Sequence, residues 1–453
     1  MNILSMDFGT SSVKLSLLRG GKEGVEILDS AKETYQIRVL NEDWVELDAE
    51  DIYSAMLRGL GKLTAGAGEG TDRISVDLIA YDVFSPSLIF MDGEGNPLYP
   101  ILTHLDRRSK KQSAEILRVM GKERFQAVTG IQPFTGGVSI TSALWVRENE
   151  GDIFRRAGRM GHLNTYIYKK LTGLWACDPV NASQTGLYQT VSGGGWSEEI
   201  AGMFGIPLRL LPEILPAGAA GGRLSPEAAR LCGLKQGIPV ALGTNDAASA
   251  QAGAGNTRAG AVLNISGSSE MISVLSAVPR IDDRYYLRCS ATPGLWQIYA
   301  TTAGGFALDW FRKEFYRDLG DKDFFESELP GIAEDFLSKP RGVEFLPYLS
   351  GDRQSITAKK GAFTGLTLET RRENLLAALL LGMHEPIRQV LGICEEFMPL
   401  EKTIKLTGGM IDRPVVKIKK QIFPAYDFEV KSECMILGSA LLALGEMERE
   451  NHG

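Results

Sequence analysis

The feature that most constrains this chain is a strand, a turn rich in glycine and hydroxyl residues, and a second strand, a pattern that occurs twice. The first copy reads MDFGTSSVKLSLL (residues 6–18) and the second reads LNISGSSEMISVL (residues 263–275). Apolar residues alternate on both sides of each turn, as in half-buried strands. Glycine permits a tight turn, and neighbouring hydroxyls suit an anion. One such turn is typical of an ordinary polar hairpin. Two such turns predict duplicated α/β lobes that bind one anion between them.

Length and charge limit the class of protein. At 453 residues the chain exceeds what one hydrophobic core supports, so we expect two or three domains. A formal charge of −7 argues against a nucleic-acid surface, and we interpret the basic cluster at 106–111 as a solvated helix face. Five scattered cysteines favour a reducing compartment, and no apolar run is long enough to span a bilayer. We therefore expect a cytoplasmic protein with no nucleic-acid or membrane partner.

Two further glycine turns follow strand-like runs, TTAGG at 301–305 and LTGGM at 406–410. Such turns let backbone approach a ligand closely. A domain boundary is expected between 235 and 260, where a buried strand at 238–243 precedes a helix of small residues. Strands are predicted at 79–81 and 86–91, and helices at 107–120 and 139–150.

In this order, the motifs resemble those of the FGGY family of carbohydrate kinases, in the superfamily of actin, sugar kinases and chaperone ATPases. MDFGTSSVK is similar to the family's first phosphate motif, D-x-G-T-[ST]-x-x-K. The segments GIPVALGTNDAASAQAGAG, ISGSS, VEFLPYLSGDR, LTGGM and LGSALLALGEME also follow the family's order, so the resemblance covers residues 2 to about 447. It implies an α/β fold of two ribonuclease H-like (actin-like) lobes with a nucleotide and sugar cleft between them. Residues 1–245 would form the sugar-binding N-terminal domain, and residues 246–453 the nucleotide-binding C-terminal domain.

The resemblance also implies roles for individual residues. Asp246 matches the catalytic base of the G-[TG]-x-D pattern; from the residues alone, a helix N-cap is an equal alternative. Asp7 would bind Mg²⁺, through water, or position phosphate, where the residues alone also allow a turn-forming Asp. Lys14 matches the first phosphate motif, although it could equally be a solvent-facing strand lysine. The implied ATP- and phosphate-binding residues are Asp7, Gly9, Thr10, Ser11, Lys14, Gly267, Ser268, Gly304, Gly408 and Gly409.

The sugar side departs from the commoner ketopentose kinases. DVFSPS (82–87) stands where they often carry G-Q-M-H-G, and HLDRR (104–108) stands where W-N-D-x-R is usual. Asp412-Arg413 replaces the usual Ser or Asn after the Gly-Gly turn, which leaves the nucleotide preference open. The candidate sugar contacts, besides Asp246, are Phe84, His104, Asp106 and Asn181, with core packing as the alternative for Phe84 and His104.

We therefore expect an ATP-dependent, Mg²⁺-requiring kinase that phosphorylates a hydroxyl of a small ketose or polyol, with a xylulose-like sugar as the first choice. The same chemistry on a tetrulose, heptulose or deoxy sugar stays open, because the departures fall where buried polar groups select the substrate. A sugar-sensing protein without turnover is the alternative from another class; a chaperone-like or filament-forming ATPase is disfavoured. The family makes a homodimer an expectation.

Overall fold

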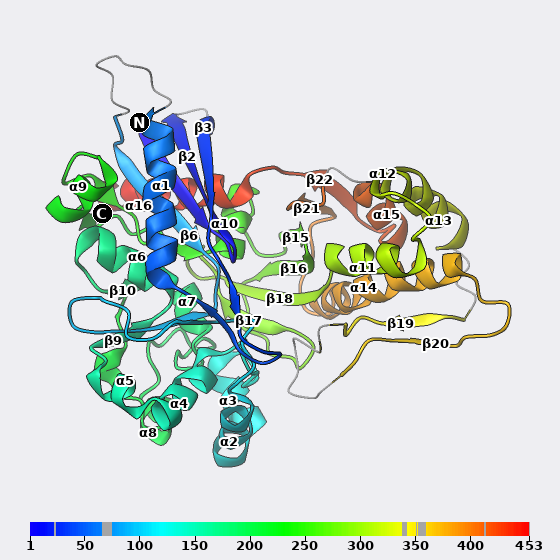
Figure 1. The fold of residues 1–453 in the computed structure, drawn as a ribbon, viewed down its shortest axis with the longest axis horizontal. Coiled ribbons are helices and arrows are strands. Elements are labelled where there is room, and N and C mark those ends of the chain that lie inside the picture. The colour runs from blue at the N-terminus through cyan, green and yellow to red at the C-terminus, as the bar shows by residue number, and fades with distance from the viewer. Residues whose placement is uncertain are drawn as a thin grey trace. The chain divides into compact units, whose positions relative to one another are not determined.

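The computed structural model describes residues 1–21, 24–65, 75–337, 342–349, 351, 359–411 and 414–452. The chain divides into two compact units. Unit 1 comprises Met1–Gly255, Leu287–Gly294 and Cys434–Gly453, and unit 2 comprises Asn256–Tyr286 and Leu295–Glu433. Figure 1 shows both as mixtures of helices and sheets.

Unit 1 is built on a mixed sheet with the strand order β12-β13-β6-β1-β2-β3, in which β14 also pairs with β6. These strands span Asn2–Phe8 (β1), Ser12–Gly21 (β2), Gly24–Thr34 (β3), Leu78–Val83 (β6), Gly222–Arg223 (β12), Pro239–Val240 (β13) and Thr244–Asn245 (β14). The predicted first strand pair is confirmed: β1 and β2 are antiparallel, and β6 runs parallel to β1 on its other side. The buried strand expected over 238–243 is only the two residues of β13.

Side chains alternate between the two faces of this sheet along each strand, and each face is covered by different helices. Leu4, Met6 and Phe8 enter the core built with α1 (Ala49–Ala65), α6 (Leu163–Thr172) and α9 (Pro226–Cys232). The intervening Ile3 and Ser5 contact α16 (Cys434–His452) on the opposite face. In Figure 1, α1 runs along β2 and β3. Because side chains alternate along a strand, Asp7 shares the face of Ile3 and Ser5.

Smaller elements complete unit 1. A second sheet has the order β4-β5-β8-β7-β9, and β10 pairs with β11. The strands of these two sheets are β4 Arg38–Val39, β5 Val45–Leu47, β7 Ser87–Met91, β8 Ile101–Thr103 and β9 Arg159–Gly161 in the first, and β10 Ala176–Cys177 and β11 Glu213–Ile214 in the second. The remaining α-helices are α2 Lys110–Met120, α3 Lys122–Thr129, α4 Ser139–Asn149, α5 Gly151–Arg156, α7 Pro179–Ser183, α8 Glu198–Met203 and α10 Asp246–Gly253.

Unit 2 repeats the topology of unit 1, as the duplicated motif predicts. Its sheet contains the strand order β18-β16-β15-β21-β22, where β15 is antiparallel to β16 and parallel to β21. The strands span β15 Val262–Ser266, β16 Ser269–Ser276, β18 Trp296–Ala303, β21 Thr403–Thr407 and β22 Asp427–Val430, with the hairpin β19 Glu344–Leu346 and β20 Ala362–Thr364. β17 (Tyr286–Cys289) begins in unit 2 and ends in unit 1. The helices are α11 Gly305–Phe315, α12 Asp321–Asp323, α13 Leu329–Phe336, α14 Arg372–Glu395 and α15 Val415–Ile422.

The compact units differ from a single division after residue 245. Helices α10 and α16 both belong to unit 1, because small residues let their backbones approach closely. A Cβ atom on Gly438 would lie 1.8 Å from the Ser249 carbonyl oxygen, and one on Gly253 would lie 1.9 Å from the Cys434 carbonyl oxygen. The two family domains at 1–245 and 246–453 stay a prediction.

The basic cluster at 106–111 is only in part the solvated helix face that the sequence suggested: Lys110 and Lys111 are exposed at the start of α2, but Arg108 is buried. Helix α2 begins at Lys110, because the Asp106 carboxylate accepts a hydrogen bond from the Arg108 backbone N–H and holds this stretch as a turn. The Arg108 guanidinium is buried and forms ion pairs of 2.8 Å with Asp106 and with Glu46. It also lies over the Trp44 ring, 4.2 Å from its centroid. Arg108 therefore stabilises the interior of unit 1.

Candidate active site

Asp246 opens α10, directly after β14. The N-cap of this helix is Asn245, whose side-chain oxygen accepts from the backbone N–H groups of Ala247 and Ala248. Asp246 is therefore the first residue inside the helix, and the residue as a whole is half-buried. Burial raises the pKa of Asp246, while a hydrogen bond from the Ala247 backbone and the charge of Arg288 act to lower it. A carboxyl group with a raised pKa is a better proton acceptor, as a general base requires.

Asp7 and Asp82 lie side by side at the ends of two parallel strands. Asp7 on β1 is in register with Asp82 on β6, and Asp82 is also in register with Thr244 on β14. Leu78 and Ala80 face α16, so Asp82 shares that face of the sheet with Asp7. Burial, followed by the charges of Asp7 and Asp246, raises the pKa of Asp82 well above its usual value. Three carboxyl groups therefore gather where β1, β6 and β14 end.

Hydrogen bonds from the backbone and from Tyr35 hold the first glycine turn in shape. The Gly9 N–H donates to the Ser12 carbonyl at 2.9 Å, and the Tyr35 hydroxyl donates to the carbonyls of Gly9 and Ser12. The Tyr35 N–H donates to the carbonyl oxygen of Ser11, one of the predicted phosphate-binding residues. Lys14 lies directly opposite Asp7 across the β1–β2 pair. The turn with Thr10 is thus held in shape next to the carboxyl groups.

A buried carboxylate, Asp178, holds the segment that leads into Asp246. It caps α7 and accepts hydrogen bonds from Thr244 Oγ1 (2.6 Å), Asn181 Nδ2 (2.7 Å) and Asn164 Nδ2 (3.0 Å). Burial raises the pKa of Asp178, against the lowering effect of these hydrogen bonds. Thr244 precedes Asp246 by two residues, so Asp178 positions the start of α10.

The predicted sugar contacts are largely buried within unit 1. Phe84 is 2% exposed and meets the His104 ring edge-on, with centroids 6.3 Å apart; His104 is partly exposed. Asn181 is fully buried beside Asp178. Asp106 is also fully buried, and its carboxylate is occupied by Arg108 and by the Val45 backbone N–H at 2.9 Å. Asp106 therefore has its own protein partners in this structure, and the sugar-contact roles stay predictions.

A polar network joins the segment 82–87 to the start of α10. The Ser85 hydroxyl accepts from Asn245 Nδ2 at 3.1 Å, and the Gln184 amide lies 3.3 Å from the same hydroxyl. With the amide of Gln184 turned so that all neighbours are satisfied, its oxygen accepts from Arg288 Nη1 at 3.1 Å. Arg288 is 2% exposed and lies close enough to Asp246 to affect its pKa. A buried cation therefore stands near the predicted base.

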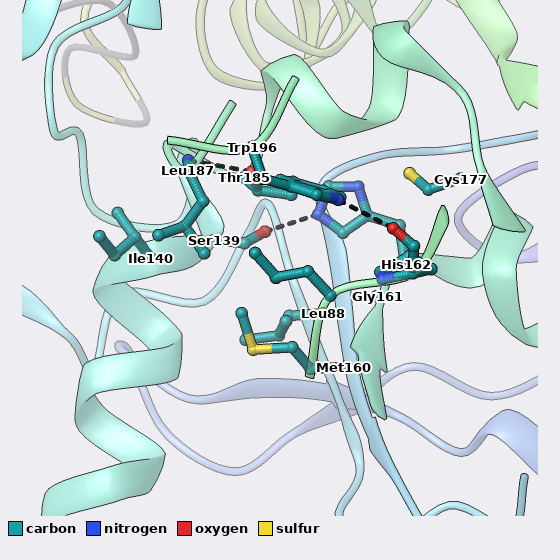
Figure 2. Close-up of a pocket in the computed structure, with 12 residues that line it drawn as sticks. Leu88, Ser139, Ile140, Met160, Gly161, His162, Cys177, Thr185, Leu187 and Trp196 are labelled. Atoms are coloured by element: carbon teal, nitrogen blue, oxygen red, sulfur yellow. Dashed lines mark hydrogen bonds between the residues drawn. The ribbon is translucent and has the colours of Figure 1, made fainter. Parts of the chain in front are cut away.

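The pocket of Figure 2 lies deeper in unit 1 and is a separate feature. It is mainly apolar and has room for at most about one water molecule. His162 lies in its wall, and the Ser139 hydroxyl is 2.7 Å from His162 Nε2. Burial lowers the pKa of His162 to about 4. None of the predicted sugar contacts lines this pocket, so it is a gap in the core and not the predicted sugar site.

In unit 2, the three glycine turns that were predicted separately meet around residues 266–269. The Gly305 N–H donates to the Gly267 carbonyl oxygen at 2.8 Å, and the Phe306 N–H donates to the Ser268 carbonyl oxygen at 3.1 Å. A Cβ on Gly304 would lie 2.5 Å from the Ser269 carbonyl carbon, and one on Gly408 would lie 2.3 Å from the Ser266 carbonyl oxygen. Gly408 also has a φ of 112°, which favours glycine. The structure thus brings the predicted unit 2 residues together, with Gly409 in open space.

Some predictions fall outside these observations. Asp412 and Arg413, the departure after the Gly-Gly turn, lie outside the described residues. Within the described ranges, no three His, Cys, Asp or Glu side chains are grouped so that they would hold a metal ion by themselves. None of the helices in the described part of the chain has the length and apolar character to span a bilayer.

Sequence reasoning missed Asp82, Asp178 and Arg288 as parts of this region. Asp82 stood in the segment recognised as unusual, but its position beside Asp7 depends on strand register. Asp178 was seen as the start of an irregular polar stretch, and the N-cap pattern Asp-Pro was its available signal. Arg288 is more than 40 residues from Asp246 in the sequence, so only the fold brings the two together.

Comparison with known proteins places these features in one class. Residues 2–253 match the model of the N-terminal domain of the FGGY family of carbohydrate kinases. Gluconokinase of Bacillus subtilis is 26% identical over 456 residues, covering 98% of this chain and 87% of that protein. Xylulose kinase of Lactococcus lactis is 25% identical, covering 93% of this chain and 83% of that protein. The crystal structure of xylulose kinase from Rhodospirillum rubrum superposes with a TM-score of 0.88 at 24% identity, covering 98% of this chain and 90% of that one.

The fold and the match define a two-lobe, actin-like carbohydrate kinase. The chain belongs to the FGGY family of carbohydrate kinases, as the sequence motifs predicted. It is therefore a phosphotransferase whose substrates are a sugar and ATP.

Proposed function

We propose that this kinase transfers the γ-phosphoryl group of ATP to a hydroxyl of a small ketose or polyol, with a xylulose-like sugar as the first choice. The observation that supports it most is the placement of Asp246. Asp246 is half-buried at the start of α10, its carboxyl group is not the helix cap, and its pKa is raised. The relatives of this chain include xylulose kinases, whose name describes this reaction.

In this proposal Asp246 accepts the proton of the attacking hydroxyl. The sugar contacts are Asp246 with Phe84, His104 and Asn181, and Asp106 contributes by holding the 104–108 segment. The fixed turn at 9–11 with Lys14, together with the unit 2 turns, binds ATP; the phosphates of ATP would be cradled by backbone N–H groups. The ATP-binding residues are Asp7, Gly9, Thr10, Ser11, Lys14, Gly267, Ser268, Gly304, Gly408 and Gly409. The close approaches at Gly304 and Gly408 support such a cradle, since any Cβ there would clash with the neighbouring turn.

Mg²⁺ fits the donor set of unit 1, because Asp7 and Asp82 offer only carboxylate oxygens, the ligands that hard cations prefer. Mg²⁺ would neutralise charge on the phosphates. Asp7 would hold it, through water. A cytoplasmic location and a homodimer belong to the same proposal.

A second substrate class, the sugar acids, is favoured by one observation. Arg288 places a buried guanidinium near Asp246, and its positive charge could pair with a substrate carboxylate. Gluconokinases are also among the relatives. A tetrulose, heptulose or deoxy sugar stays open because the segment 82–87 differs from the ketopentose kinases.

The test is ADP release measured across a panel of ketoses, polyols, deoxy sugars and aldonates. One substrate should stimulate turnover, and Asp246→Asn should lower kcat by about 100- to 10,000-fold while ADP still binds. If no compound stimulates turnover but one raises the melting temperature of both proteins equally, the sugar-sensing alternative replaces the kinase proposal. If only an aldonate is turned over, and Arg288→Met selectively raises its KM, the sugar-acid class is correct.

A further inference from the structure

Glu270 is a buried carboxylate that ties together the two strands of the second glycine turn. It lies directly opposite Ser266 in the register of β15 and β16. One of its oxygens accepts from the Ser266 hydroxyl at 2.5 Å, and the other accepts from Asn264 Nδ2 at 2.9 Å. Glu270 is 4% exposed, and both of its partners are buried. Glu270 therefore holds two residues of β15 just before the chain turns at Gly267 and Ser268.

Ser266 connects this hairpin to the other two glycine turns of unit 2. Its carbonyl oxygen accepts from the Met410 N–H at 3.0 Å, and the same oxygen lies where a Cβ on Gly408 would be. One residue further along, the Gly267 carbonyl accepts from the Gly305 N–H. A displacement of Ser266 would thus be passed to all three turns that are proposed to bind ATP.

A small cavity adjoins the place where these turns meet. Ser266, Glu270, Gly305, His384 and Met410 are among the residues that line it, and it has room for about one water molecule. Atoms that line a void lack van der Waals partners on one side. Close packing therefore does not hold the turns in place on the side of the cavity, so the hydrogen bonds of Glu270 supply rigidity there.

The charge of Glu270 strengthens these hydrogen bonds. A hydrogen bond with an ionised acceptor is about twice as strong as a neutral one. The Lys419 ammonium, 2.8 Å away, compensates this charge inside unit 2. If the carboxylate moved, it would leave the buried ammonium without its partner, which is costly. The pair therefore fixes the position in which Glu270 holds Ser266.

We propose that Glu270 is a positioning residue for ATP, which keeps the turn at 266–269 in the shape that binds the phosphates. It acts through Ser266 and Asn264 and not by contact with the nucleotide. The proposal rests on the proposed function for the assignment of this turn to ATP, and it deepens that function by naming what holds the turn. Backbone N–H groups bind a phosphate only when they point at it, so a relaxed turn should bind ATP more weakly in a protein that is still folded.

The test separates the shape of the turn from the stability of the protein. Glu270→Leu combined with Lys419→Met replaces the buried ion pair by apolar side chains, a change that often leaves stability intact. This double variant should melt close to the wild type, yet bind ADP about tenfold more weakly in isothermal titration calorimetry. The matched control, Lys420→Met with Asp427→Leu, removes an exposed ion pair of unit 2 and should leave the affinity for ADP unchanged. Equal affinity in the wild type and the Glu270→Leu, Lys419→Met variant would overturn the proposal.

Two single substitutions complete the design. Ser266→Ala removes only the hydroxyl that Glu270 holds and should also weaken ADP binding; it decides the question if the double variant does not fold. Ser268→Ala, inside the turn, tests the proposed ATP site itself. If Ser268→Ala weakens ADP binding but the double variant binds ADP normally, the ATP site stands and Glu270 has only a structural role. If none of these variants changes the affinity for ADP, the turn does not bind the nucleotide, and the positioning role fails together with the proposed ATP site.

Discussion

The ammonium of Lys419 lies 2.8 Å from the carboxylate of Glu270, and both side chains are shut off from solvent inside unit 2. Lys419 also donates to Asn264 Oδ1 at 2.7 Å and contacts His384 Nε2 at 3.3 Å. Burial lowers the pKa of Lys419 despite its partner; burial acts to raise the pKa of Glu270, but Lys419 holds it below its usual value. Since Glu270 also accepts from the Ser266 hydroxyl, this cluster supports the turn where the glycine motifs meet.

Removal of the Lys419 charge should therefore be costly. Lys419→Met should lower the free energy of unfolding by about 3–5 kcal/mol in urea titrations, because it leaves Glu270 buried without its partner. The matched control is Lys420→Met, next in the chain, whose ion pair with Asp427 is exposed and should be worth less than about 1 kcal/mol. Similar effects of the two substitutions would show that the buried pair has no special role. Adding Glu270→Leu to Lys419→Met should recover most of the loss.

Stability should fall with acidification because of His162. Its folded pKa of about 4 lies below the ordinary value of 6.5, since burial disfavours the charged ring. Between pH 6.5 and 4 the unfolded chain takes up a proton that the folded chain does not, so unfolding becomes easier as pH falls, by about 1.4 kcal/mol per unit for this group. Above pH 6.5 the histidine contributes no slope.

The measurement compares urea unfolding of the wild type and His162→Gln from pH 8 to 4. The difference between the two proteins should be constant above pH 6.5 and should change in favour of the variant below it. His384, whose pKa burial also lowers to about 4, predicts the same behaviour for His384→Gln. A pH-independent difference would mean that the folded histidine protonates normally.

The contact between α10 and α16 should tolerate no side chain at Gly438. Gly438→Ala should destabilise the protein by about 1–3 kcal/mol, because the new methyl would meet the Ser249 carbonyl oxygen. Gly445 lies in the same helix, but a Cβ added there would meet open space. Gly445→Ala should therefore stabilise the protein by about 0.5–1 kcal/mol through helix propensity. Thermal unfolding of the two variants is sufficient, and a similar loss for both would argue against close helix contact.

The two glycines of the LTGGM turn should behave differently. Gly408→Ala should lower stability, because the residue has a positive φ and its Cβ would meet Ser266. Gly409→Ala should leave the melting temperature unchanged, since nothing surrounds its Cβ, but should raise the KM for ATP by about tenfold, or ~1.4 kcal/mol, if the nucleotide occupies that space. An unchanged KM with intact stability would place the nucleotide elsewhere.

Local patterns were sufficient to predict the repeated strand–turn–strand motif, the helix that begins near Asp246 and the family. Alternating apolar residues and glycine turns are local signals, so β1, β2, β15 and β16 appear where they were expected. The failures have a common cause in long-range contacts. Arg108 was taken for a surface residue because its partner Glu46 is 62 residues away, and Asp82 was noticed only as a departure because strand register is invisible in a single segment.

The same limit applies to the charged residues of unit 2. Lys419 lies in a helix rich in lysine, where a solvated side chain is the ordinary expectation. Its burial depends on Asn264 and Glu270, about 150 residues earlier in the chain. Its sequence neighbours give no sign of this contact.

The return of α16 to unit 1 has a consequence for protein synthesis. Ser5, in the first strand, hydrogen bonds to Ile436 and Ser439, in the last helix. A ribosome therefore releases the first strand of the sheet long before the helix that covers one of its faces exists. Until α16 has been made, Ile3, Leu78 and Ala80 lack this cover, so the nascent chain should depend on chaperones. A message cut short before the codons of α16 should yield a protein that is degraded and not a shortened kinase.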